Sequence, residues 1–211
     1  MDAPYYFSVR HDLIGLIPKG ANRILEVGCA AGMTGKALKE AGFDEVVGIE
    51  CIEEIARRGE GYYDRLFIGD VEQIELPYAP GHFDCILYPD VLEHLRDPWN
   101  TLKKHSAMVR AGGTVICSIP NIRHYRVMKK LAFKGKFEYE SDGIMDKTHL
   151  RFFTLSSIRE LLIDAGFEPL RVIKKPSGAA WLKMVNRVTG GRLIDCLVRQ
   201  YIVLAQKKGT R

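Results

Sequence analysis

The stretch RILEVGCAAGMTG, residues 23–35, decides the fold class of this chain. Five residues suited to a buried β-strand, 23–27, run directly into a loop with glycines at positions 28, 32 and 35. A helix-forming segment follows over 34–41 and ends at Gly42. A strand that turns through glycines into a helix is typical of the first unit of an α/β sheet protein. The chain should therefore continue as alternating strands and helices.

The later apolar runs continue this alternation. Six further strands are expected, and they fall at 46–50, 66–70, 83–90, 114–120, about 169–174 and 201–205. Helices are expected at 53–58, 99–109 and 155–165. The strands are apolar on both faces, as strands of a parallel sheet between two helix layers are. The sequence thus predicts an α/β fold with a seven-stranded, mostly parallel sheet flanked by helices on both faces.

The length of 211 residues suits a single domain, residues 1–211, with appendages. Residues 1–20 are expected to form an N-terminal helical cap. Residues 121–153, rich in aromatic, glycine and charged residues, are interpreted as an excursion over the carboxyl ends of the strands. Residues 177–200 are interpreted as a helical insertion before the last strand.

Composition narrows the class of protein. The chain is 46% hydrophobic and 27% charged, with a formal net charge of +5. This mild basic excess does not indicate nucleic-acid binding, but it allows an anionic substrate or a peripheral contact with a membrane surface. The five cysteines include no CxxC pair, and neither a signal peptide nor an apolar run of 18 residues is present. A cytoplasmic protein is expected, and the oligomeric state stays open.

Acidic residues stand where three successive strands end. Glu26 closes the first strand, Glu50 the second and Asp70 the third. Ligands of open α/β sheets bind outside the carboxyl ends of the strands, so these carboxylates should surround one site. A carboxylate at Glu50 can accept hydrogen bonds from a ribose diol, and one at Asp70 can reach an adenine amino group. The pattern predicts a nucleotide site beside the glycine loop.

Five segments together resemble class I S-adenosylmethionine-dependent methyltransferases, which have a Rossmann-like fold. They are ILEVGCAAG, VVGIE, FIGDVEQIELPY, FDCILYPDVLEHLRDPW and GGTVICSIPN, within residues 20–170. The resemblance implies S-adenosylmethionine as cofactor, with Glu26 and Gly28 near its methionine part, Glu50 at the ribose, and Asp70 with Val71 at the adenine. The full set of expected cofactor residues is Glu26, Gly28, Cys29, Ala30, Gly32, Glu50, Cys51, Asp70, Val71 and Tyr88. Ala30 stands where the family usually has glycine.

The fourth-strand segment carries Asp90, Glu93 and His94, a [DE]xxEH pattern. A helix would place Asp90 and His94 one turn apart on one face, with Glu93 beside them. The pattern resembles that of ubiquinone-pathway O-methyltransferases and small-RNA 2′-O-methyltransferases, in which such residues can hold a divalent metal. His149 is a candidate for a second histidine of such a site. The same EHL segment also occurs in methyltransferases that use no metal, where it supports the loop.

The segment DKTHLRFFT, residues 146–154, resembles a signature of bacterial methyltransferases of surface-polysaccharide and lipid-linked sugar pathways. That resemblance implies that His149 faces the acceptor and that Arg151 binds an anionic or hydroxyl group. We interpret His149 as the proton acceptor, with His94 as its competitor and Arg151 as the third catalytic candidate. A structural ion pair is the alternative role for Arg151. Thr154 is expected to cap the following helix.

An oxygen acceptor is expected because the N-methyltransferase signature [DN]PP[YF] is absent, and residues 88–91 read YPDV. A small molecule such as a quinone-like phenol, a sugar nucleotide and a lipid-linked glycan all stay open. His124 and Tyr125 are further candidates on the acceptor side.

Two other functions stay open. Tyr125 and Lys129 have the YxxxK spacing of NAD(P)-dependent short-chain reductases, although the glycine loop departs from both nicotinamide fingerprints. The domain could also be a non-catalytic cofactor-binding partner in a glycosyltransferase pathway. The acidic strand ends argue against that role, because a degenerate domain need not keep them.

Overall fold

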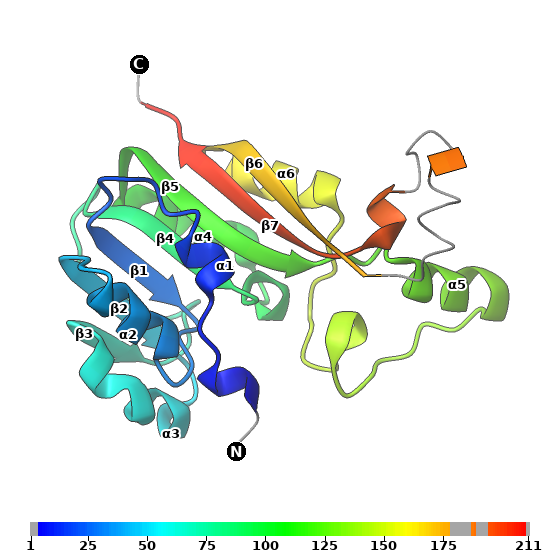
Figure 1. Ribbon diagram of the computed structural model, residues 1–211, viewed down its shortest axis with the longest axis horizontal. Helices are drawn as coiled ribbons and strands as arrows, with labels where there is room; N and C mark the ends of the chain where they lie inside the picture. The colour runs from blue at the N-terminus through cyan, green and yellow to red at the C-terminus, as the bar shows by residue number, and fades with distance from the viewer. Residues whose placement is uncertain (1–3, 178–186, 189–193, 210–211) are drawn as a thin grey trace.

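A seven-stranded sheet forms the centre of the computed structural model, which describes residues 4–177, 187–188 and 194–209 (Figure 1). The strands follow the order β3-β2-β1-β4-β5-β7-β6 across the sheet. Their bounds are β1 (Arg23–Val27), β2 (Glu45–Glu50), β3 (Arg65–Ile68), β4 (Phe83–Pro89), β5 (Val109–Pro120), β6 (Phe167–Pro176) and β7 (Val198–Lys207). Strands β1 to β5 pair in parallel, and only β7 runs antiparallel, to both β5 and β6. The predicted mostly parallel sheet is confirmed.

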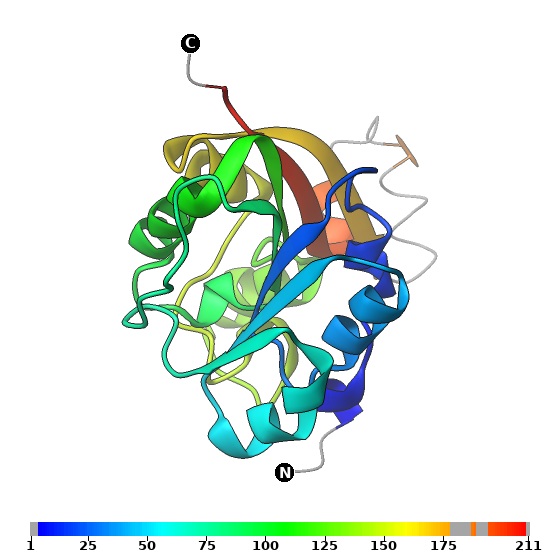
Figure 2. The ribbon, with the colours of Figure 1, turned by 90° about the vertical axis from the view of Figure 1, so that its left-hand side faces the viewer.

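Helices cover both faces of the sheet (Figure 2). Helices α4 (Pro98–Met108) and α6 (Leu155–Asp164) lie on one face, and α1 (His11–Ile14) and α2 (Met33–Glu40) lie on the other. The remaining helices are α3 (Glu53–Ala56), α5 (Tyr125–Lys134) and the 3₁₀ helices η1 (Pro4–Phe7), η2 (Arg57–Tyr62), η3 (Leu92–His94), η4 (Gly143–Met145) and η5 (Ile194–Leu197). No helix in the described part of the chain is long and apolar enough to cross a membrane.

Two hydrophobic cores explain why the strands are apolar on both faces. Neighbouring residues of β1 point to opposite sides: Leu25 packs in the core under α4 and α6, and Ile24 packs in the core under α1 and α2. Both side chains are fully buried. Burial of such a side chain stabilises the fold by roughly 1.5–3 kcal/mol, so apolar residues are favoured at successive positions.

Helix α6 begins with a capping box. The Thr154 hydroxyl accepts a hydrogen bond from the Ser157 N–H, and the Ser157 hydroxyl accepts one from the Thr154 N–H. The predicted N-cap at Thr154 is confirmed. Asp97 caps α4 in the same way, because its carboxylate accepts from the Asn100 N–H at 3.0 Å.

Two predicted boundaries were wrong for identifiable reasons. Strand β3 ends at Ile68, before Asp70, because Gly69 adopts a φ of 154°. Gly112 and Gly113 lie inside β5, which begins at Val109 and not at the expected residue 114. A Cβ at Gly113 would lie 2.7 Å from Val109 Cγ1 and 2.9 Å from the Asp84 oxygen, so close packing within the sheet explains that glycine.

The excursion over 121–153 contains more regular structure than expected, namely α5 and η4. Of the proposed helical insertion over 177–200, residues 178–186 and 189–193 lie outside the described part of the chain. The antiparallel β7 begins beside the end of β5, since Pro120 pairs with Gln200. The segments that follow β1, β2, β4 and β5 therefore share one edge of the sheet with the start of β7.

Candidate functional site

The loop after β1 adopts left-handed backbone conformations at three positions. The φ angles are 72° at Gly28, 48° at Ala30 and 79° at Gly32. The Gly28 and Cys29 N–H groups donate to the Ile49 oxygen at 2.8 and 3.0 Å, which ties the loop to β2. The Cys29 side chain is buried against β2, where a Cβ at Gly48 would lie 2.9 Å from its Sγ.

Packing alone already requires two of these glycines. A Cβ at Gly28 would lie 2.4 Å from Val91 Cγ2, and one at Gly32 would lie 2.8 Å from the Gly59 Cα. A larger residue at either position would therefore disturb the fold together with any ligand contact. The packing role of these glycines is compatible with the predicted ligand-binding role.

Ala30 is strained, because a left-handed conformation costs an L-residue roughly 1–2 kcal/mol that glycine does not pay. We expect Ala30→Gly to stabilise the protein by about 0.5–1 kcal/mol, since the flexibility of glycine in the unfolded chain offsets part of the relief. Calorimetric unfolding should show a rise in Tm of about 1–4 °C. Ala31→Gly, at the buried neighbour without a left-handed φ, is the matched control and should lower Tm. A fall in Tm for Ala30→Gly as large as that of the control would contradict the strain argument.

Glu50 ties two loops together at the end of β2. Its Oε2 accepts from the Ala30 N–H at 2.9 Å, and its Oε1 accepts from the Ile52 N–H at 3.0 Å. The side chain is only 6% exposed. The Cys51 thiol lies 3.4 Å from Oε1, and its burial together with the Glu50 carboxylate raises its pKa to about 11. The predicted ribose ligand is thus also a structural anchor of the glycine loop.

Glu26 is a buried carboxyl group beneath the glycine loop. Its Oε2 accepts from the Tyr63 hydroxyl at 2.8 Å, and the side chain is 1% exposed. Burial raises the pKa of Glu26 to about 8, although the Tyr63 hydrogen bond opposes this shift. Tyr63 also packs on α2, where a Cβ at Gly35 would lie 2.3 Å from its ring. A cationic group beside Glu26 would favour its ionised form.

Asp70 lies at the expected edge but beyond its strand. It is exposed, and it accepts from the Glu72 N–H at 2.9 Å and from the Gln73 amide at 3.2 Å. The next residue, Val71, is buried in the core below. Asp70 and Val71 therefore place an exposed carboxylate and a buried apolar side chain next to each other, near the end of β2.

Tyr88, one of the expected cofactor residues, turns its side chain into the core and away from the glycine loop. Tyr88 is fully buried, and its hydroxyl lies 2.6 Å from Nδ1 of His105 on α4. The alternation of β4 turns Tyr88 into the core beneath α4, and Pro89 is the β4 residue that borders the glycine loop.

Asp90 does not form a helical face with His94, as the sequence had suggested. Its φ of 56° turns the chain, and η3 begins only at Leu92. The Asp90 carboxylate pairs with Arg10 at 2.5 Å, and it accepts hydrogen bonds from the Ser118 hydroxyl and the Gln200 amide. These partners come from three other segments and fix the Asp90 carboxylate beside Arg10, from where its negative charge still contributes to the raised pKa of Glu93.

Arg10 is a site residue that the sequence analysis missed. Its guanidinium binds Asp90 and the Ser118 hydroxyl, and its backbone N–H donates to Thr34 Oγ1 at 3.1 Å. It borders one cavity together with Ser8, Glu26, Gly28, Cys29, Ala30, Thr34 and Pro89. No motif marks this residue, and the only available signal is that it is the sole arginine or lysine in the first 18 residues.

Glu93, His94 and His149 form the most distinctive cluster of the site. Their potential ligand atoms all lie within 4.8 Å of one another. Glu93 is 1% exposed, and neither of its carboxylate oxygens has a hydrogen-bond partner among the described residues. Burial raises the pKa of Glu93 well above its usual range. An unpartnered buried carboxylate is costly, so the cluster is chemically incomplete as it stands.

Hydrogen bonds between η3 and the end of the excursion assemble this cluster. The Glu93 backbone oxygen accepts from the Leu150 and Arg151 N–H groups at 2.8 and 2.9 Å. His94 Nδ1 lies 3.1 Å from the Thr148 oxygen, and His149 Nδ1 lies 3.0 Å from the Ile144 oxygen. Each imidazole therefore keeps its Nε2 for another partner. Burial, and secondarily His149, lowers the pKa of His94.

Carboxylate and imidazole donors at this spacing suit Zn²⁺ or Mn²⁺. The three predicted metal residues are not brought together, because Asp90 pairs with Arg10. His149 takes its place beside Glu93 and His94.

Arg151, predicted to bind the acceptor, makes structural contacts at the end of the excursion. Its Nε donates to the Arg96 backbone oxygen at 2.9 Å, as does its Nη2, and its guanidinium lies 5.6 Å from the centroid of the Trp99 ring. Arg151 thus fastens the end of the excursion to the start of α4. The partner is a backbone carbonyl and not the carboxylate expected for a structural ion pair, and acceptor binding by Arg151 stays a prediction.

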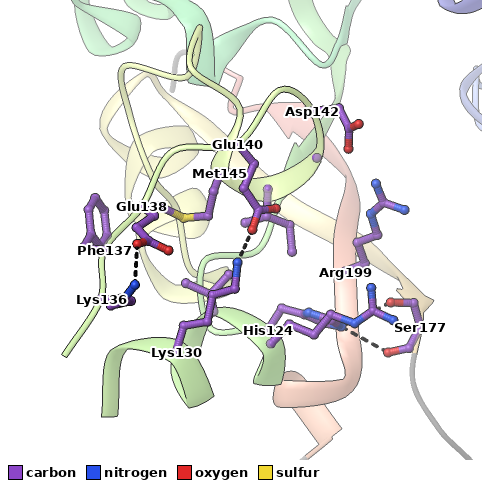
Figure 3. A pocket seen from close by; sticks show the side chains of 14 residues that line it. His124, Lys130, Lys136, Phe137, Glu138, Glu140, Asp142, Met145, Ser177 and Arg199 are labelled. Carbon is purple, nitrogen blue, oxygen red and sulfur yellow. Dashed lines mark hydrogen bonds and ion pairs between the residues drawn. The ribbon is translucent and has the colours of Figure 1, made fainter. Parts of the chain in front are cut away.

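A cavity of about 420 Å³ lies between α5, the excursion and the start of β7 (Figure 3). His124 lines it and is fixed by the Ser177 backbone oxygen at 3.1 Å from its Nε2. Tyr125 lies beside His124, and its hydroxyl accepts from Arg126 Nε at 3.2 Å. The cavity adjoins the segment that follows the carboxyl end of β5.

Comparisons with known proteins agree with this architecture. Residues 3–172 match a family model described as a methyltransferase domain. A probable S-adenosylmethionine-dependent methyltransferase of Mycobacterium tuberculosis is 24% identical over 205 residues, which cover 96% of this chain and 70% of that protein. A ubiquinone biosynthesis O-methyltransferase of Maricaulis maris is 28% identical over 207 residues, which cover 92% of this chain and 75% of that protein.

Solved structures show the same fold. A crystal structure of an S-adenosylmethionine-dependent methyltransferase from Archaeoglobus fulgidus matches with a TM-score of 0.68 and 16% identity, over 90% of this chain and 87% of that one. The chain belongs to the methyltransferase-domain family and is an S-adenosylmethionine-dependent methyltransferase.

Proposed function

We propose that this enzyme methylates a hydroxyl group of a small-molecule, sugar or lipid-linked acceptor. The observation that carries the proposal is the buried, unpartnered Glu93 carboxylate facing the two imidazoles of His94 and His149. The cluster follows β4 directly, and Val91 packs on Gly28 of the cofactor loop. Groups that can activate a hydroxyl therefore stand next to the expected cofactor site.

The described side chains fit the chemistry of S-adenosylmethionine, which supplies an electrophilic methyl group. The cavity bordered by Arg10 and Glu26 offers a cation for a carboxylate and an acid for an ammonium group. Glu50 stands beside the glycine loop for a ribose diol, and Asp70 with Val71 lies one strand further for the adenine. The groups along the strand ends thus follow the order of the methionine, ribose and adenine parts of the ligand, and their chemistry is complementary to each part.

Glu93, His94 and His149 also fit a divalent cation, which would supply Lewis-acid assistance by lowering the pKa of the acceptor hydroxyl. In that arrangement Glu93 would neutralise part of the ionic charge, and the two Nε2 atoms would complete the ligand set. Without a cation, His149 is the candidate to accept the hydroxyl proton. In either case the excursion holds the acceptor oxygen near the cofactor loop and restricts water.

The named activity of the Maricaulis maris relative supports oxygen as the acceptor atom. The absence of the [DN]PP[YF] signature from residues 88–91 agrees with it. Neither alternative gains a supporting observation. Tyr125 interacts with Arg126 and not with Lys129, and the cofactor-side acids are all in place for a catalytic domain.

Glu26 predicts a pH dependence of cofactor binding. Its raised pKa of about 8 means that the folded protein holds a proton at neutral pH that a nearby ammonium group would expel. The affinity for S-adenosylhomocysteine should rise by up to about tenfold per pH unit as pH increases toward 8. Calorimetry at pH 7 in buffers of different ionisation enthalpy should detect the release of up to about one proton per site. Glu26→Gln should abolish this release, and an identical release from that variant would assign the proton to another group.

Removing and restoring metal ions tests the proposed hydroxyl activation. The purified enzyme, supplied with a divalent metal ion, is assayed with S-adenosylmethionine and a panel of catechols, sugar nucleotides and polyprenyl-linked sugars. We expect methyl transfer to a hydroxyl compound, its loss in EDTA, and its recovery with Mg²⁺, Mn²⁺ or Zn²⁺. Full activity in EDTA would discard the metal and leave His149 as base. Transfer only to amine or carbon acceptors would overturn the oxygen assignment.

A further inference from the structure

Helix α5 and the turn that follows it carry a concentrated positive charge. Residues 123–136 include six arginines and lysines and no acidic residue, one more than the formal net charge of +5 of the whole chain. The six are Arg123, Arg126, Lys129, Lys130, Lys134 and Lys136. The mild basic excess of the protein is therefore localised in one segment, and the rest of the chain carries no net positive charge.

Large apolar side chains stand exposed among these cations. Phe133 is 84% exposed, Phe137 49%, Leu131 44% and Met128 42%. Only Val127 of α5 is buried against the protein. Ten consecutive residues, 131–140, are exposed. We name the six cations together with these four apolar side chains the basic apolar surface. Exposed apolar groups gathered in this way indicate an interaction surface.

Several of these cations have no carboxylate partner. Lys130 pairs with Glu140, and Lys136 pairs with Glu138. In contrast, Arg126, Lys129 and Lys134 form no ion pair with any residue that the structure describes. The positive charge of these three residues can therefore attract an anionic partner. The exposed ring of Phe133, which lies in the same segment, favours an apolar environment.

We propose that the basic apolar surface binds the face of an anionic lipid bilayer. A short helix with lysine and arginine interleaved with exposed phenylalanine, leucine and methionine suits the boundary between head groups and acyl chains. The cations attract acidic head groups, and Phe133 and Leu131 enter the apolar layer below them. An anionic bilayer thus provides both the negative charge that the cations attract and the apolar layer that the exposed apolar side chains favour.

The position of this surface gives membrane contact a consequence. Lys130, Lys136 and Phe137 also line the cavity of about 420 Å³ beside His124 (Figure 3). A bilayer on the basic apolar surface would lie next to the cavity, so an amphiphilic acceptor could enter it without leaving the interface. This last step rests on the proposed function, whereas bilayer binding itself rests only on the surface.

Vesicle flotation tests the proposal with the intact protein. Vesicles of phosphatidylcholine alone are compared with vesicles that contain about one third phosphatidylglycerol, at low and at high salt. We expect the protein to float with the anionic vesicles, to bind neutral ones at least tenfold more weakly, and to be released by salt because the Debye length shrinks.

Matched variants distinguish vesicle binding through the basic apolar surface from an effect of the overall charge and hydrophobicity of the protein. Lys129→Gln with Lys134→Gln should weaken binding to anionic vesicles by about tenfold or more, since each basic residue near such a surface contributes severalfold. Phe133→Ser should weaken it by a further tenfold or more. The controls remove the same groups elsewhere: Lys19→Gln with Lys103→Gln, and Leu170→Ser on β6, all at exposed positions. The controls should float like the parent.

Four outcomes would overturn the inference. The parent protein could fail to float, it could bind neutral and anionic vesicles equally, or the controls could lose as much binding as the surface variants. Dimerisation through Phe133 without flotation would also overturn it and assign the surface to a second copy of the chain. Calorimetry with S-adenosylhomocysteine on the same variants keeps the results separate, because cofactor binding should be unchanged whether or not vesicles bind.

Discussion

Replacing His149 with alanine is expected to lower kcat by about 10²–10⁴-fold and to leave the affinity for S-adenosylhomocysteine within about twofold of the parent. The imidazole is 7% exposed and fixed through Nδ1 by the Ile144 oxygen, so its Nε2 is held in place toward the Glu93 and His94 cluster. Removal costs either a metal ligand or the proton acceptor. Both roles act on the acceptor, and neither touches the cofactor groups at Glu26 and Glu50.

A matched histidine is available as the control for this variant. His82 precedes β4, at the opposite end of that strand from the cluster, and hydrogen-bonds to Glu45 at 2.6 Å. His82→Ala removes a hydrogen-bonded imidazole that is more exposed, 25% against 7% for His149, without approaching the site, and it should keep kcat within about twofold. Thermal unfolding of both variants distinguishes a chemical loss from a folding defect. A kcat for His149→Ala within a few-fold of the parent would make the residue purely structural.

The metal-binding and base roles differ in a second measurement. If His149 is a ligand, His149→Ala should weaken Mn²⁺ binding by about 10-fold or more in a titration without acceptor, and added Mn²⁺ should recover part of the activity. If His149 is the base, Mn²⁺ should bind neither protein and should restore nothing. The two arms are exclusive, because one requires a cation in the cluster and the other does not.

The sheet was predictable from sequence because its strands are buried on both faces. Ile24 and Leu25 pack into opposite cores, so a strand appears in the sequence as a continuous apolar run, and these runs indicate which segments are strands. Glu50 was predictable for a related reason, since a charged residue directly after an apolar strand must lie at the edge of the sheet. Local pattern and global position agree at these residues.

Arg10 and Asp90 could not be predicted in the same way. Their ion pair joins positions 80 residues apart, and the left-handed φ of Asp90 breaks the helix that the spacing of Asp90, Glu93 and His94 suggested. The orientation of Tyr88 was equally unpredictable, because a strand end has two faces and the sequence did not show which one packs against α4. Long-range pairing, and not local propensity, decided each of these cases.

The cluster of Glu93, His94 and His149 could be predicted in part from the sequence. The sequence identified Glu93, His94 and His149 as candidate residues from two separate motifs. Only the backbone hydrogen bonds from Leu150 and Arg151 to the Glu93 oxygen show that the motifs meet. The side chain of Arg151 supports this meeting of the two motifs, because it holds the excursion against Arg96 and Trp99.

Glu50→Ala is expected to weaken S-adenosylhomocysteine binding by about 10–150-fold, the equivalent of 1.5–3 kcal/mol for hydrogen bonds to a charged group. The structure adds a second consequence, because Glu50 also accepts from the Ala30 and Ile52 N–H groups. The variant should therefore unfold at a lower temperature than the parent even without ligand. Glu53→Ala is the matched control, since Glu53 is an exposed acid three residues further along and pairs only with Arg57 on the surface.

A ligand that lacks one ribose hydroxyl separates the direct contact from loosening of the loop. In the parent protein, 2′-deoxy-S-adenosylhomocysteine should bind about 10-fold or more weakly than S-adenosylhomocysteine, because the carboxylate loses a donor. In Glu50→Ala the two ligands should bind almost equally, since the group that distinguishes them is gone. An undiminished preference for the full ribose in the variant would show that Glu50 only holds the loop. The diol would then have to be assigned to another group at the end of β2.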